Sequence, residues 1–427
     1  MTGTDPRPDH VRRDDCRLCG SGQLQLVVPL TPTPIADAYV TRAELDMVQK
    51  SYPIDLWFCD SCSHVQLRDV VRPDLLFRPE YTFLTGSSAS NVTHFREYTQ
   101  SVLSREKPAP GALAVDVGSN DGTFLRFFQE AGLRVLGVDP ATEVARRATE
   151  AGIETWPAFF GREAARRIRS ERGPARLVTA NNVFAHADDL AGMADAVRDV
   201  LAPDGAFVFE VSYVVDVVER MLLGTIFHEH LCYHAVRPMR AFLRRHGLEL
   251  VNVERNSAQG GSIIGTAQPI GGPRTVASAV EDVDRMEVDR GMDRAETYRA
   301  FSRRIESLRS EIGSVLDRIA SEKKTLAGFG AARGGTTMLC HFGLGRRLAF
   351  IVDDSPAKQG LYSPGDHVPV LPSQALYERK PDYVFILAWV HAQAILARHR
   401  AYCDQGGKFI TVGEGVEVVG AIGVHKH

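Results

Sequence analysis

A glycine-rich turn between an apolar run and a helical pattern limits most strongly what this chain can fold into. Ala114 to Val117 reads as a buried strand, Gly118 to Gly122 as a tight turn, and the residues from Thr123 onward as the start of a helix. Glycine is needed where the backbone takes a positive φ or approaches a ligand closely, and the helix N-terminus then supplies free N–H donors. By itself, this pattern fits a cofactor loop or another α/β turn equally well.

Apolar strand patterns alternate with helical patterns on both sides of this turn, between about residues 86 and 275. Strand, helix and strand at this spacing predict right-handed crossovers and a doubly wound parallel sheet, and hence an α/β domain of the Rossmann-like class. The strand patterns lie at residues 112–118, 134–139, 175–183 and 206–212, and the helical patterns at 143–152 and 190–205.

The composition of the turn indicates which cofactor it would hold. The sequence Gly-Ser-Asn-Asp-Gly is not the GxGxxG of a dinucleotide site, and Asp121 would repel a pyrophosphate. An acidic loop is better suited to the sulfonium and amino groups of S-adenosylmethionine. Asp139 ends the next strand, 21 residues after Gly118, where a carboxylate accepts hydrogen bonds from ribose hydroxyls.

Two asparagines add to this prediction, because Asn181 and Asn182 end a further strand pattern at the edge where ligands bind in such sheets. We therefore predict a methyltransferase that uses S-adenosylmethionine. The turn alone leaves a nicotinamide-dependent oxidoreductase open as the alternative. The predicted cofactor-binding residues are Asp116, Gly118, Asn120, Asp121, Gly122, Asp139, Asn181 and Asn182.

Four of the seven cysteines form two Cys-x-x-Cys pairs within residues 1–85. This region has short strand patterns at 24–30, 52–59 and 64–67 and is too small to bury much core, so a metal would stabilise its fold. The pairs are 39 residues apart, farther than in compact zinc fingers, and two buried or redox-active pairs are the alternative. His64 could replace a ligand, but we expect it at the surface. We predict a structural Zn²⁺ held by the thiolates of Cys16, Cys19, Cys59 and Cys62.

The last region, 276–427, combines a helical arm with a second strand series. Apolar residues recur every three or four positions between about 280 and 322, which predicts an amphipathic helix. Runs at 324–335, 347–356, 382–389 and 407–413 then indicate another Rossmann-like α/β unit. Its loop from Gly328 resembles a dinucleotide site, but we expect an adapted unit without a cofactor. The recurring apolar positions of the arm are Tyr298, Phe301, Ile305, Leu308, Ile312 and Val315.

A histidine-rich segment follows the strand pattern at 206–212. His228, Glu229 and His230 are consecutive, and in an extended segment the two imidazoles would point to the same side. An imidazole titrating near neutrality can abstract a proton next to a carbonyl, so we predict His230 as the base and Glu229 as its orienting partner. His186, five residues after Asn181, is expected at the same edge of the sheet. A hydrogen-bonded structural cluster is the alternative.

Composition excludes several classes of partner. The net charge is -3 with Lys and Arg scattered along the chain, which gives no footprint for nucleic acid. No stretch approaches the roughly 18 uninterrupted apolar residues of a membrane span. The N-terminus also lacks an apolar signal core, so we expect a cytoplasmic protein.

These motifs, in their order, resemble the S-adenosylmethionine-dependent sugar C-methyltransferases of deoxysugar biosynthesis, such as the C-3'-methyltransferase of the D-tetronitrose pathway. The resemblance covers nearly the whole chain. It also includes a segment from Tyr81 to Ser87, Gly-Gly-Ser at 260–262 and Gly-Phe-Gly-Ala at 328–331. It implies a zinc module at 1–85, a methyltransferase domain at 86–275 and a helical arm with a Rossmann-like domain at 276–427.

The resemblance also implies a reaction, the methylation of a carbon next to the 4-keto group of a TDP-sugar. We expect the enzyme to be a monomer. His230 would remove the proton with support from Glu229, while Tyr81 and His186 would stabilise the enolate. Phe227 departs from the family, which usually has a tyrosine there. An N- or O-methyltransferase and a non-catalytic binding protein remain as alternatives. Ser262 and Arg333 are the candidate contacts of the TDP group.

Overall fold

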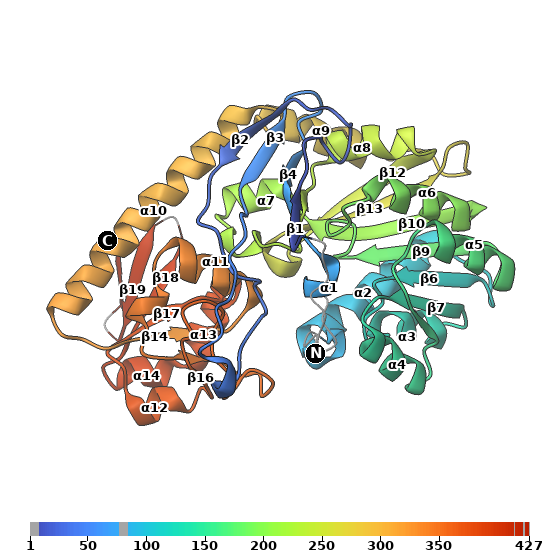
Figure 1. Ribbon diagram of the computed structural model, residues 1–427. Coiled ribbons are helices and arrows are strands. Elements are labelled where there is room, and N and C mark those ends of the chain that lie inside the picture. Colours follow the sequence, from blue (N-terminus) through green and yellow to red (C-terminus); the bar gives the residue numbers. More distant parts are fainter. Residues whose placement is uncertain (1–7, 77–83, 414, 422, 427) are drawn as a thin grey trace.

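The computed structural model describes residues 8–76, 84–413, 415–421 and 423–426, and it has three parts (Figure 1). An N-terminal part with a small antiparallel sheet lies between two α/β parts. The central part and the C-terminal part are each built on a seven-stranded sheet. The long helix α10 (Ala295–Ser321) runs from the N-terminal part toward the C-terminal sheet. The predicted α/β class with two Rossmann-like units is confirmed.

The N-terminal sheet includes one strand that belongs to the central part. Its own strands are β2 (Leu24–Val28), β3 (Leu56–Cys59) and β4 (Val65–Leu67), each inside a predicted strand run. The fourth strand is β11 (Cys232–Tyr233), which pairs antiparallel with β4. A separate pair, β1 (His10–Arg12) and β5 (Asp69–Val71), joins the two ends of this part.

The central sheet has the strand order β12-β13-β10-β9-β6-β7-β8, with the strands from β10 to β8 parallel. Side chains alternate between its faces because successive residues of a strand point in opposite directions. Ala114 belongs to the core on the face covered by the helices at 89–106 and 123–130. Val115 belongs to the core on the other face. The strands are β6 (Leu113–Val117), β7 (Arg134–Asp139), β8 (Thr155–Pro157), β9 (Ala175–Asn181), β10 (Leu201–Ser212), β12 (Leu248–Asn256) and β13 (Ser262–Pro269).

Helices cover both faces of this sheet, as a doubly wound fold requires. Helix α2 packs with α3 on one face, and α5 packs with α6 on the other. The helices are α2 (Ala89–Glu106), α3 (Thr123–Glu130), α4 (Thr142–Glu150), α5 (Arg162–Glu171), α6 (Leu190–Val200), α7 (Val214–Glu219) and α8 (Val236–Arg245). Short elements flank these helices: α1 (Pro73–Leu76), which follows β5, and the 3-10 turns η2 (Thr85–Ser87), η3 (Leu223–Thr225) and η4 (Ala258–Gly260).

The predicted helical arm is two helices rather than one. Helix α9 (Ser278–Asp289) ends before Gly291, whose φ of 69° belongs to the left-handed region, and α10 begins at Ala295. The apolar periodicity of the sequence continues across this break, so the periodicity did not predict that the helix ends there. The six apolar positions predicted for the arm are all buried along α10.

The C-terminal sheet has the order β16-β15-β14-β17-β18-β19-β20, and its last two strands are antiparallel. Its strands are β14 (Leu326–Phe329), β15 (Ile351–Val352), β16 (Val370–Leu371), β17 (Tyr383–Ile386), β18 (Lys408–Val412), β19 (Val416–Gly420) and β20 (Gly423–Lys426). Its helices are α11 (Arg333–His341), α12 (Ala375–Arg379), α13 (Ala392–Arg398) and α14 (Arg400–Asp404).

The chain between the two cysteine pairs leaves the N-terminal sheet and crosses to the C-terminal part (Figure 1). Thr33 and Tyr52 form a bridge where this excursion leaves and returns, and Val40 forms an antiparallel bridge with Tyr362. The wide spacing of the pairs, unusual for a compact zinc finger, is therefore the length of a connection between two parts of the protein.

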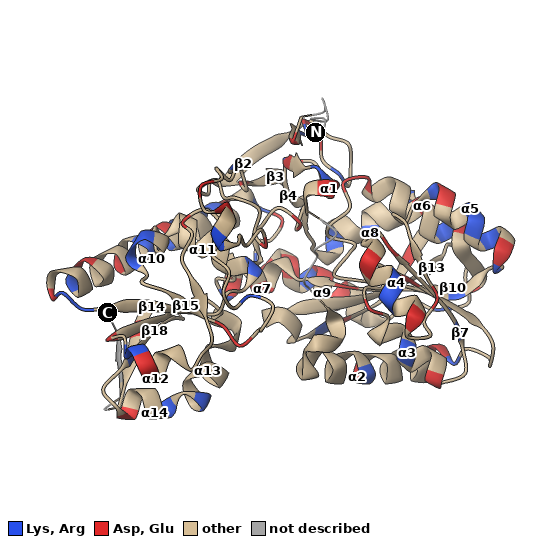
Figure 2. Ribbon diagram, turned by 60° about the horizontal axis from the view of Figure 1, so that its bottom comes forward, with Lys and Arg blue, Asp and Glu red and all other residues tan. Residues whose placement is uncertain are grey.

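Acidic and basic residues are interspersed along the ribbon in all three parts (Figure 2). On α4, for example, Glu143 pairs with Arg146 and Arg147, and Arg146 also pairs with Glu150. Among the described residues, none of the helices has the length and apolar character to cross a membrane.

Candidate active site

The predicted glycine turn joins β6 to α3 and has the geometry expected of a cofactor loop. Gly118 and Gly122 have φ values of 69° and 75°, so both occupy the left-handed region that favours glycine. A Cβ on Gly118 would lie 2.3 Å from a methyl carbon of Val183. The turn therefore packs directly against the loop that follows β9, which carries Asn182 and His186.

Asp139 holds this turn in place from the end of β7. Its carboxylate accepts hydrogen bonds from the backbone N–H groups of Asn120, at 2.9 Å, and Ala141, at 2.8 Å. Burial raises the pKa of Asp139, and the two backbone donors oppose this increase. A carboxylate oxygen has a second lone pair, so the carboxylate can also accept bonds from a ribose.

The residues around the turn include buried polar groups without partners. The side-chain amide of Asn181 and the hydroxyl of Ser119 are buried and make no hydrogen bond to any residue that the structure describes. An unsatisfied buried group costs about 1–3 kcal/mol, which a bound ligand can recover. Asp116, next to them in β6, accepts a bond from the Thr179 hydroxyl at 2.6 Å, and burial raises its pKa to about 7. This donor and acceptor set fits S-adenosylmethionine.

Two loop side chains instead hold the segment that precedes α2. Asn120 accepts a hydrogen bond from the backbone N–H of Thr85, at 2.9 Å. Asp121 accepts one from Gly86, at 2.8 Å, and one from Thr123 at the start of α3. Both side chains thus connect the turn to the region next to Tyr81, which itself lies outside the described residues.

His230 lies at the end of a turn that starts at Phe227 and closes with a hydrogen bond between their backbones. Its Nδ1 lies 2.7 Å from the carbonyl oxygen of Thr225. A carbonyl only accepts, so Nδ1 carries the proton and the lone pair of neutral His230 is on Nε2. Nε2 makes no hydrogen bond to any described residue. Burial lowers the pKa of His230 to about 4, below the near-neutral value expected from the sequence, so the imidazole is neutral at pH 7.

Two aromatic rings frame this imidazole. The Phe227 ring lies 4.1 Å from it, measured between centroids, and the His186 ring stacks on it at 5.0 Å. The pKa of His186 is also lowered, mainly by burial and then by the charge of His230. The structure thus brings together His186 and His230, the two histidines predicted to share the carboxyl edge of the sheet. Phe227, the departure from the expected tyrosine, supplies apolar surface against the imidazole of His230.

His228 has a separate environment, contrary to the expectation that both imidazoles share one side. Its Nε2 lies 3.2 Å from the carbonyl oxygen of Tyr52, and it is almost fully buried. The expectation was wrong because residues 227–230 form a turn, not an extended segment. His64 is also not at the surface, since it is fully buried and stacks on His234.

Glu229 points to the C-terminal part rather than to His230. Its Oε2 accepts a hydrogen bond from Arg333, at 2.7 Å, and Arg333 also lies 3.5 Å from Asp37. Lys358 donates to the other oxygen of Asp37 at 3.0 Å. Burial raises the pKa of Glu229 to about 7 against the opposing effect of Arg333. Two cations of the C-terminal part therefore meet one carboxylate from each of the other parts.

Ser262 lies farther along the sheet edge and is fully buried, with its hydroxyl donating to the carbonyl of Ala258 at 3.1 Å. Asn182 has a φ of 55° and donates its backbone N–H to Glu210, the carboxyl-edge residue of the next strand. Glu210 is buried and accepts from His94 of α2, at 2.9 Å, and from Asn256. His94 and Glu210 thus add a polar pair at this edge.

Sequence reasoning did not find several of these groups. Thr225 acts through a backbone carbonyl, which any residue type supplies, and Asp37 and Lys358 meet only in the folded chain. The one available signal was Glu210 itself, a carboxylate at the end of an apolar strand pattern beside the predicted asparagines.

The four cysteines of the N-terminal part form a cluster that suits a metal ion. Their Sγ atoms all lie within 4.8 Å of one another, and no disulfide links them. Sulfurs around a tetrahedral Zn²⁺ at about 2.3 Å would be roughly 3.8 Å apart. Each pair lies in a tight turn of its own, and the two turns are alike. The backbone N–H of Gly20 donates to the carbonyl of Cys16, and that of Ser63 donates to the carbonyl of Cys59.

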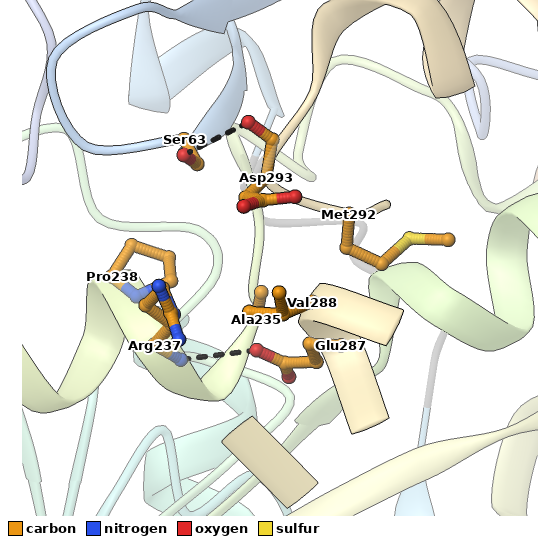
Figure 3. A pocket seen from close by; sticks show the side chains of 8 residues that line it. All are labelled: Ser63, Ala235, Arg237, Pro238, Glu287, Val288, Met292 and Asp293. Atoms are coloured by element: carbon orange, nitrogen blue, oxygen red, sulfur yellow. Dashed lines mark hydrogen bonds between the residues drawn. The ribbon is translucent and has the colours of Figure 1, made fainter. Parts of the chain in front are cut away.

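A small cavity lies elsewhere, lined by Ser63 of the N-terminal part and by residues of helices α8 and α9 (Figure 3). Its main charged group, Glu287, accepts hydrogen bonds from the backbone of Val236 and Arg237 and from the Tyr213 hydroxyl. Glu287 therefore caps helix α8, and we assign the cavity a packing role.

Three family models match consecutive parts of the chain. Residues 16–77 match a model described as "Putative zinc binding domain", 93–253 match a methyltransferase domain, and 257–412 match a C-methyltransferase C-terminal domain. C-methyltransferase NovU of Streptomyces niveus is 34% identical over 398 residues, which are 93% of this chain and 94% of NovU. The chain belongs to this C-methyltransferase family. It is an S-adenosylmethionine-dependent methyltransferase with an N-terminal zinc-binding domain.

Solved structures resemble parts of this C-methyltransferase. The PH0226 protein from Pyrococcus horikoshii OT3 has a TM-score of 0.38 and 16% identity, covering 45% of this chain and 99% of that one. Magnesium protoporphyrin IX methyltransferase from Synechocystis has a TM-score of 0.33 and 17% identity, covering 42% of this chain and 84% of that one.

Proposed function

We propose that this C-methyltransferase methylates C-3 of a TDP-linked 4-keto deoxysugar. The observation that carries the proposal is the neutral, Nδ1-anchored imidazole of His230, whose lone pair lies on Nε2. A carbon next to a carbonyl becomes nucleophilic only after its proton is removed, and a neutral imidazole is the base that this step needs. Methylation of oxygen or nitrogen requires no such activation of carbon.

The residues have the following roles in this proposal. His230 takes the C-3 proton on Nε2, while Thr225 keeps the ring oriented. His186, together with Tyr81, would face the keto group and stabilise the enolate oxygen, as the family resemblance implies. S-adenosylmethionine, when bound, supplies an electrophilic methyl group. Its predicted ligands position that group for in-line attack by carbon. The predicted ligands are Asp116, Gly118, Asn120, Asp121, Gly122, Asp139, Asn181 and Asn182.

Glu229 and Arg333 act on the sugar-nucleotide side. Their 2.7 Å hydrogen bond turns the Glu229 carboxylate away from His230 and fixes the position of the Arg333 guanidinium. Arg333 would contact the TDP group there. Lys358 lies near enough to share Asp37 with Arg333 and adds a second positive charge on this side. Ser262 remains a candidate contact, although its hydroxyl would first have to leave Ala258. We further propose that the enzyme acts as a monomer.

The proton-removal step can be measured separately from methyl transfer. The enzyme is incubated in D₂O with the TDP-4-keto-2,6-dideoxysugar and S-adenosylhomocysteine, and exchange of the C-3 proton is followed by NMR. We expect wild-type enzyme to exchange this proton and His230→Asn to lose exchange. With S-adenosylmethionine, the product should carry the methyl on C-3. A methyl group on oxygen or nitrogen would contradict the proposal.

A further inference from the structure

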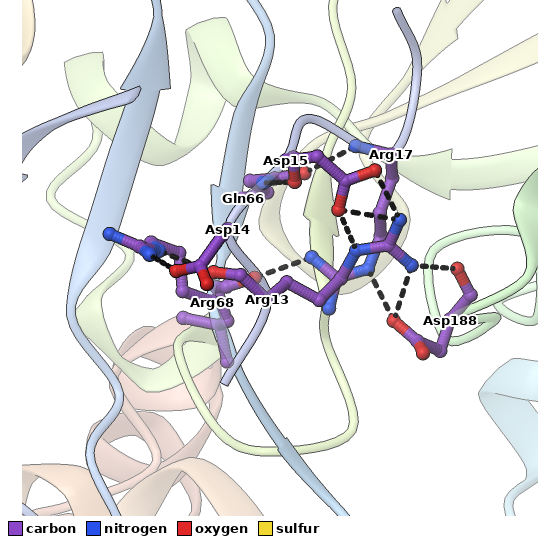
Figure 4. A network of polar contacts seen from close by, with 8 residues as sticks. Arg13, Asp14, Asp15, Arg17, Gln66, Arg68 and Asp188 are labelled. Carbon is purple, nitrogen blue, oxygen red and sulfur yellow. Dashed lines mark hydrogen bonds and ion pairs between the residues drawn. The ribbon is translucent and has the colours of Figure 1, made fainter. Parts of the chain in front are cut away.

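The zinc-binding part contacts the loop that carries His186 through a buried arginine. Arg17 lies between two of the zinc ligands, Cys16 and Cys19, and its side chain has no exposed surface. Its Nε donates to a carboxylate oxygen of Asp188, at 3.1 Å, and its guanidinium also donates to the carbonyl of Leu67 (Figure 4). A buried guanidinium is strongly disfavoured unless it is paired, so these contacts fix its position.

Asp188 is held from a second direction by the same part of the protein. Arg13 donates to its carboxylate and to its backbone carbonyl, both at 3.1 Å, while Asp15 binds the other side of Arg13 with both oxygens (Figure 4). Planar two-point pairing of this kind fixes orientation as well as distance. Asp188 is only two residues from His186.

The loop has one further connection to this region on the other side of His186. The backbone N–H of Cys232, in β11, donates to the carbonyl of Ala185 at 3.1 Å, and Leu67 donates to Leu231 at 2.9 Å. Strand β11 begins two residues after His230 and pairs with β4 of the N-terminal sheet. Both histidines of the site are therefore attached to the part that the cysteine cluster organises.

We propose that Arg17 and Asp188 are positioning residues that set the stacking of His186 on His230, so that the zinc cluster orders the active site as well as its own fold. The proposal rests on the proposed function, in which His186 faces the substrate. The cysteine turn fixes the backbone of Arg17, the buried guanidinium fixes Asp188, and Asp188 fixes the short loop that bears His186. The zinc ligands themselves take no part in the chemistry, because a closed four-thiolate site leaves no open position.

A double-mutant cycle separates this role from a general structural one. Asp188→Asn keeps the side-chain shape but removes its charge. We expect it to lower kcat about tenfold, less than the roughly 100-fold that a 1 Å misplacement can cost. The KM for S-adenosylmethionine and the zinc content should not change. In a His186→Asn background, the same substitution should leave kcat almost unchanged, because its effect passes through His186.

Asp14→Asn is the matched control, since it removes a nearby carboxylate that pairs with Arg68 and makes no side-chain bond to Arg13, Arg17 or Asp188. It should keep wild-type kcat. Arg17→Lys keeps the charge without the planar fork and should reproduce a smaller loss with the same dependence on His186. An equal fall of kcat for Asp188→Asn in both backgrounds, or no fall in the wild type, would overturn the proposal.

Hydrogen exchange supplies the readout that does not depend on activity. In Asp188→Asn with its zinc retained, we expect faster amide exchange in residues 182–189 than in wild type and unchanged exchange in the cysteine turns. If His186→Asn alone keeps wild-type kcat, the proposed catalytic role of His186 fails. The exchange experiment still tests whether Arg17 and Asp188 hold the loop that bears His186. That part of the proposal is wrong if residues 182–189 exchange at the wild-type rate.

Discussion

His230 differs from a histidine base that is paired with a carboxylate. A carboxylate partner would raise its pKa, but its ring is anchored on the neutral carbonyl of Thr225 and packed against Phe227. Burial is then the largest influence, and it lowers the pKa to about 4. The imidazole of His230 is consequently uncharged at neutral pH and is a weaker base than an exposed imidazole.

Removal of the Phe227 ring should move the pH dependence of the reaction. Phe227→Ala admits water to the imidazole, so the pKa of His230 should rise from about 4 toward its usual 6.5. Because the pKa rises, the acidic limb of the plot of kcat/KM against pH should shift to higher pH. Phe227→Tyr keeps the ring and restores the residue usual in the family, and its acidic limb should stay near the wild-type position. An unchanged limb in Phe227→Ala would show that another group controls it.

The pair of His94 and Glu210 should make stability depend on pH. The hydrogen bond to Glu210 is the main cause of the raised pKa of His94, and burial opposes it. The stabilisation is complete below the unfolded pKa of 6.5 and is lost as pH rises through the higher folded pKa. Urea unfolding of wild type and His94→Gln should therefore differ more at about pH 5.5 than at about pH 8.5. An equal difference at both pH values would contradict this.

At the scale of elements, the turn that bears His230 lies between two packed surfaces. On one side, β11 continues it into the N-terminal sheet. On the other, α11 packs so closely that a Cβ on Gly334 would lie 2.0 Å from the carbonyl oxygen of Gly224. The Thr337 hydroxyl of α11 also donates to the carbonyl of Ile226 at 2.5 Å. The turn that bears His230 is therefore held by neighbouring elements at both of its ends.

Gly118→Ala tests the packing of the cofactor turn. The new Cβ would both strain a positive φ and overlap Val183, so we expect the free energy of unfolding to fall by about 2–3 kcal/mol. Val183→Ala in the same chain removes the overlap but not the strain, and should recover part of the loss. Urea denaturation measures both, and titration calorimetry should show weaker S-adenosylmethionine binding in Gly118→Ala. Wild-type stability of Gly118→Ala would contradict this account.

Elements were predictable where burial is periodic and short in range. The runs that became β6, β7 and β9 are apolar because both faces of their sheet are covered, and α10 shows its buried stripe directly. The break at Gly291 was not predictable, because the apolar spacing continues through it. Within the site, His186 and His230 followed from their places after strands. The contacts of Asp37 could not be predicted, because they join residues that are about 300 positions apart.

At the scale of the whole molecule, the proposed active site contains residues of all three parts. The central part supplies both histidines, the C-terminal part supplies Arg333 and Lys358, and the excursion between the cysteine pairs supplies Asp37. The same excursion is fastened to the C-terminal part at Val40 and Tyr362. The relative positions of the three parts therefore depend on contacts at the site itself.

Asp37→Asn should loosen this arrangement. Asp37 is mostly buried and balances two cations, so the substitution should lower the free energy of unfolding by about 2 kcal/mol. It should also raise the KM for the sugar nucleotide, because Arg333 and Lys358 lose a fixed partner. Asp46→Asn, at an exposed position of the same excursion, is the control and should match wild type in urea unfolding and kinetics. Equal stability of Asp37→Asn and wild type would contradict this role.

The pairing of β11 with the N-terminal sheet limits how domains can be exchanged between related enzymes. A chain that ended after the zinc-binding segment would leave β4 with an open edge, and open edges promote self-association. A central part joined to a different N-terminal part would lose the strand that pairs with β11, the segment that follows His230. Recombination in this family should therefore succeed only when the short strand and the sheet that receives it are inherited together.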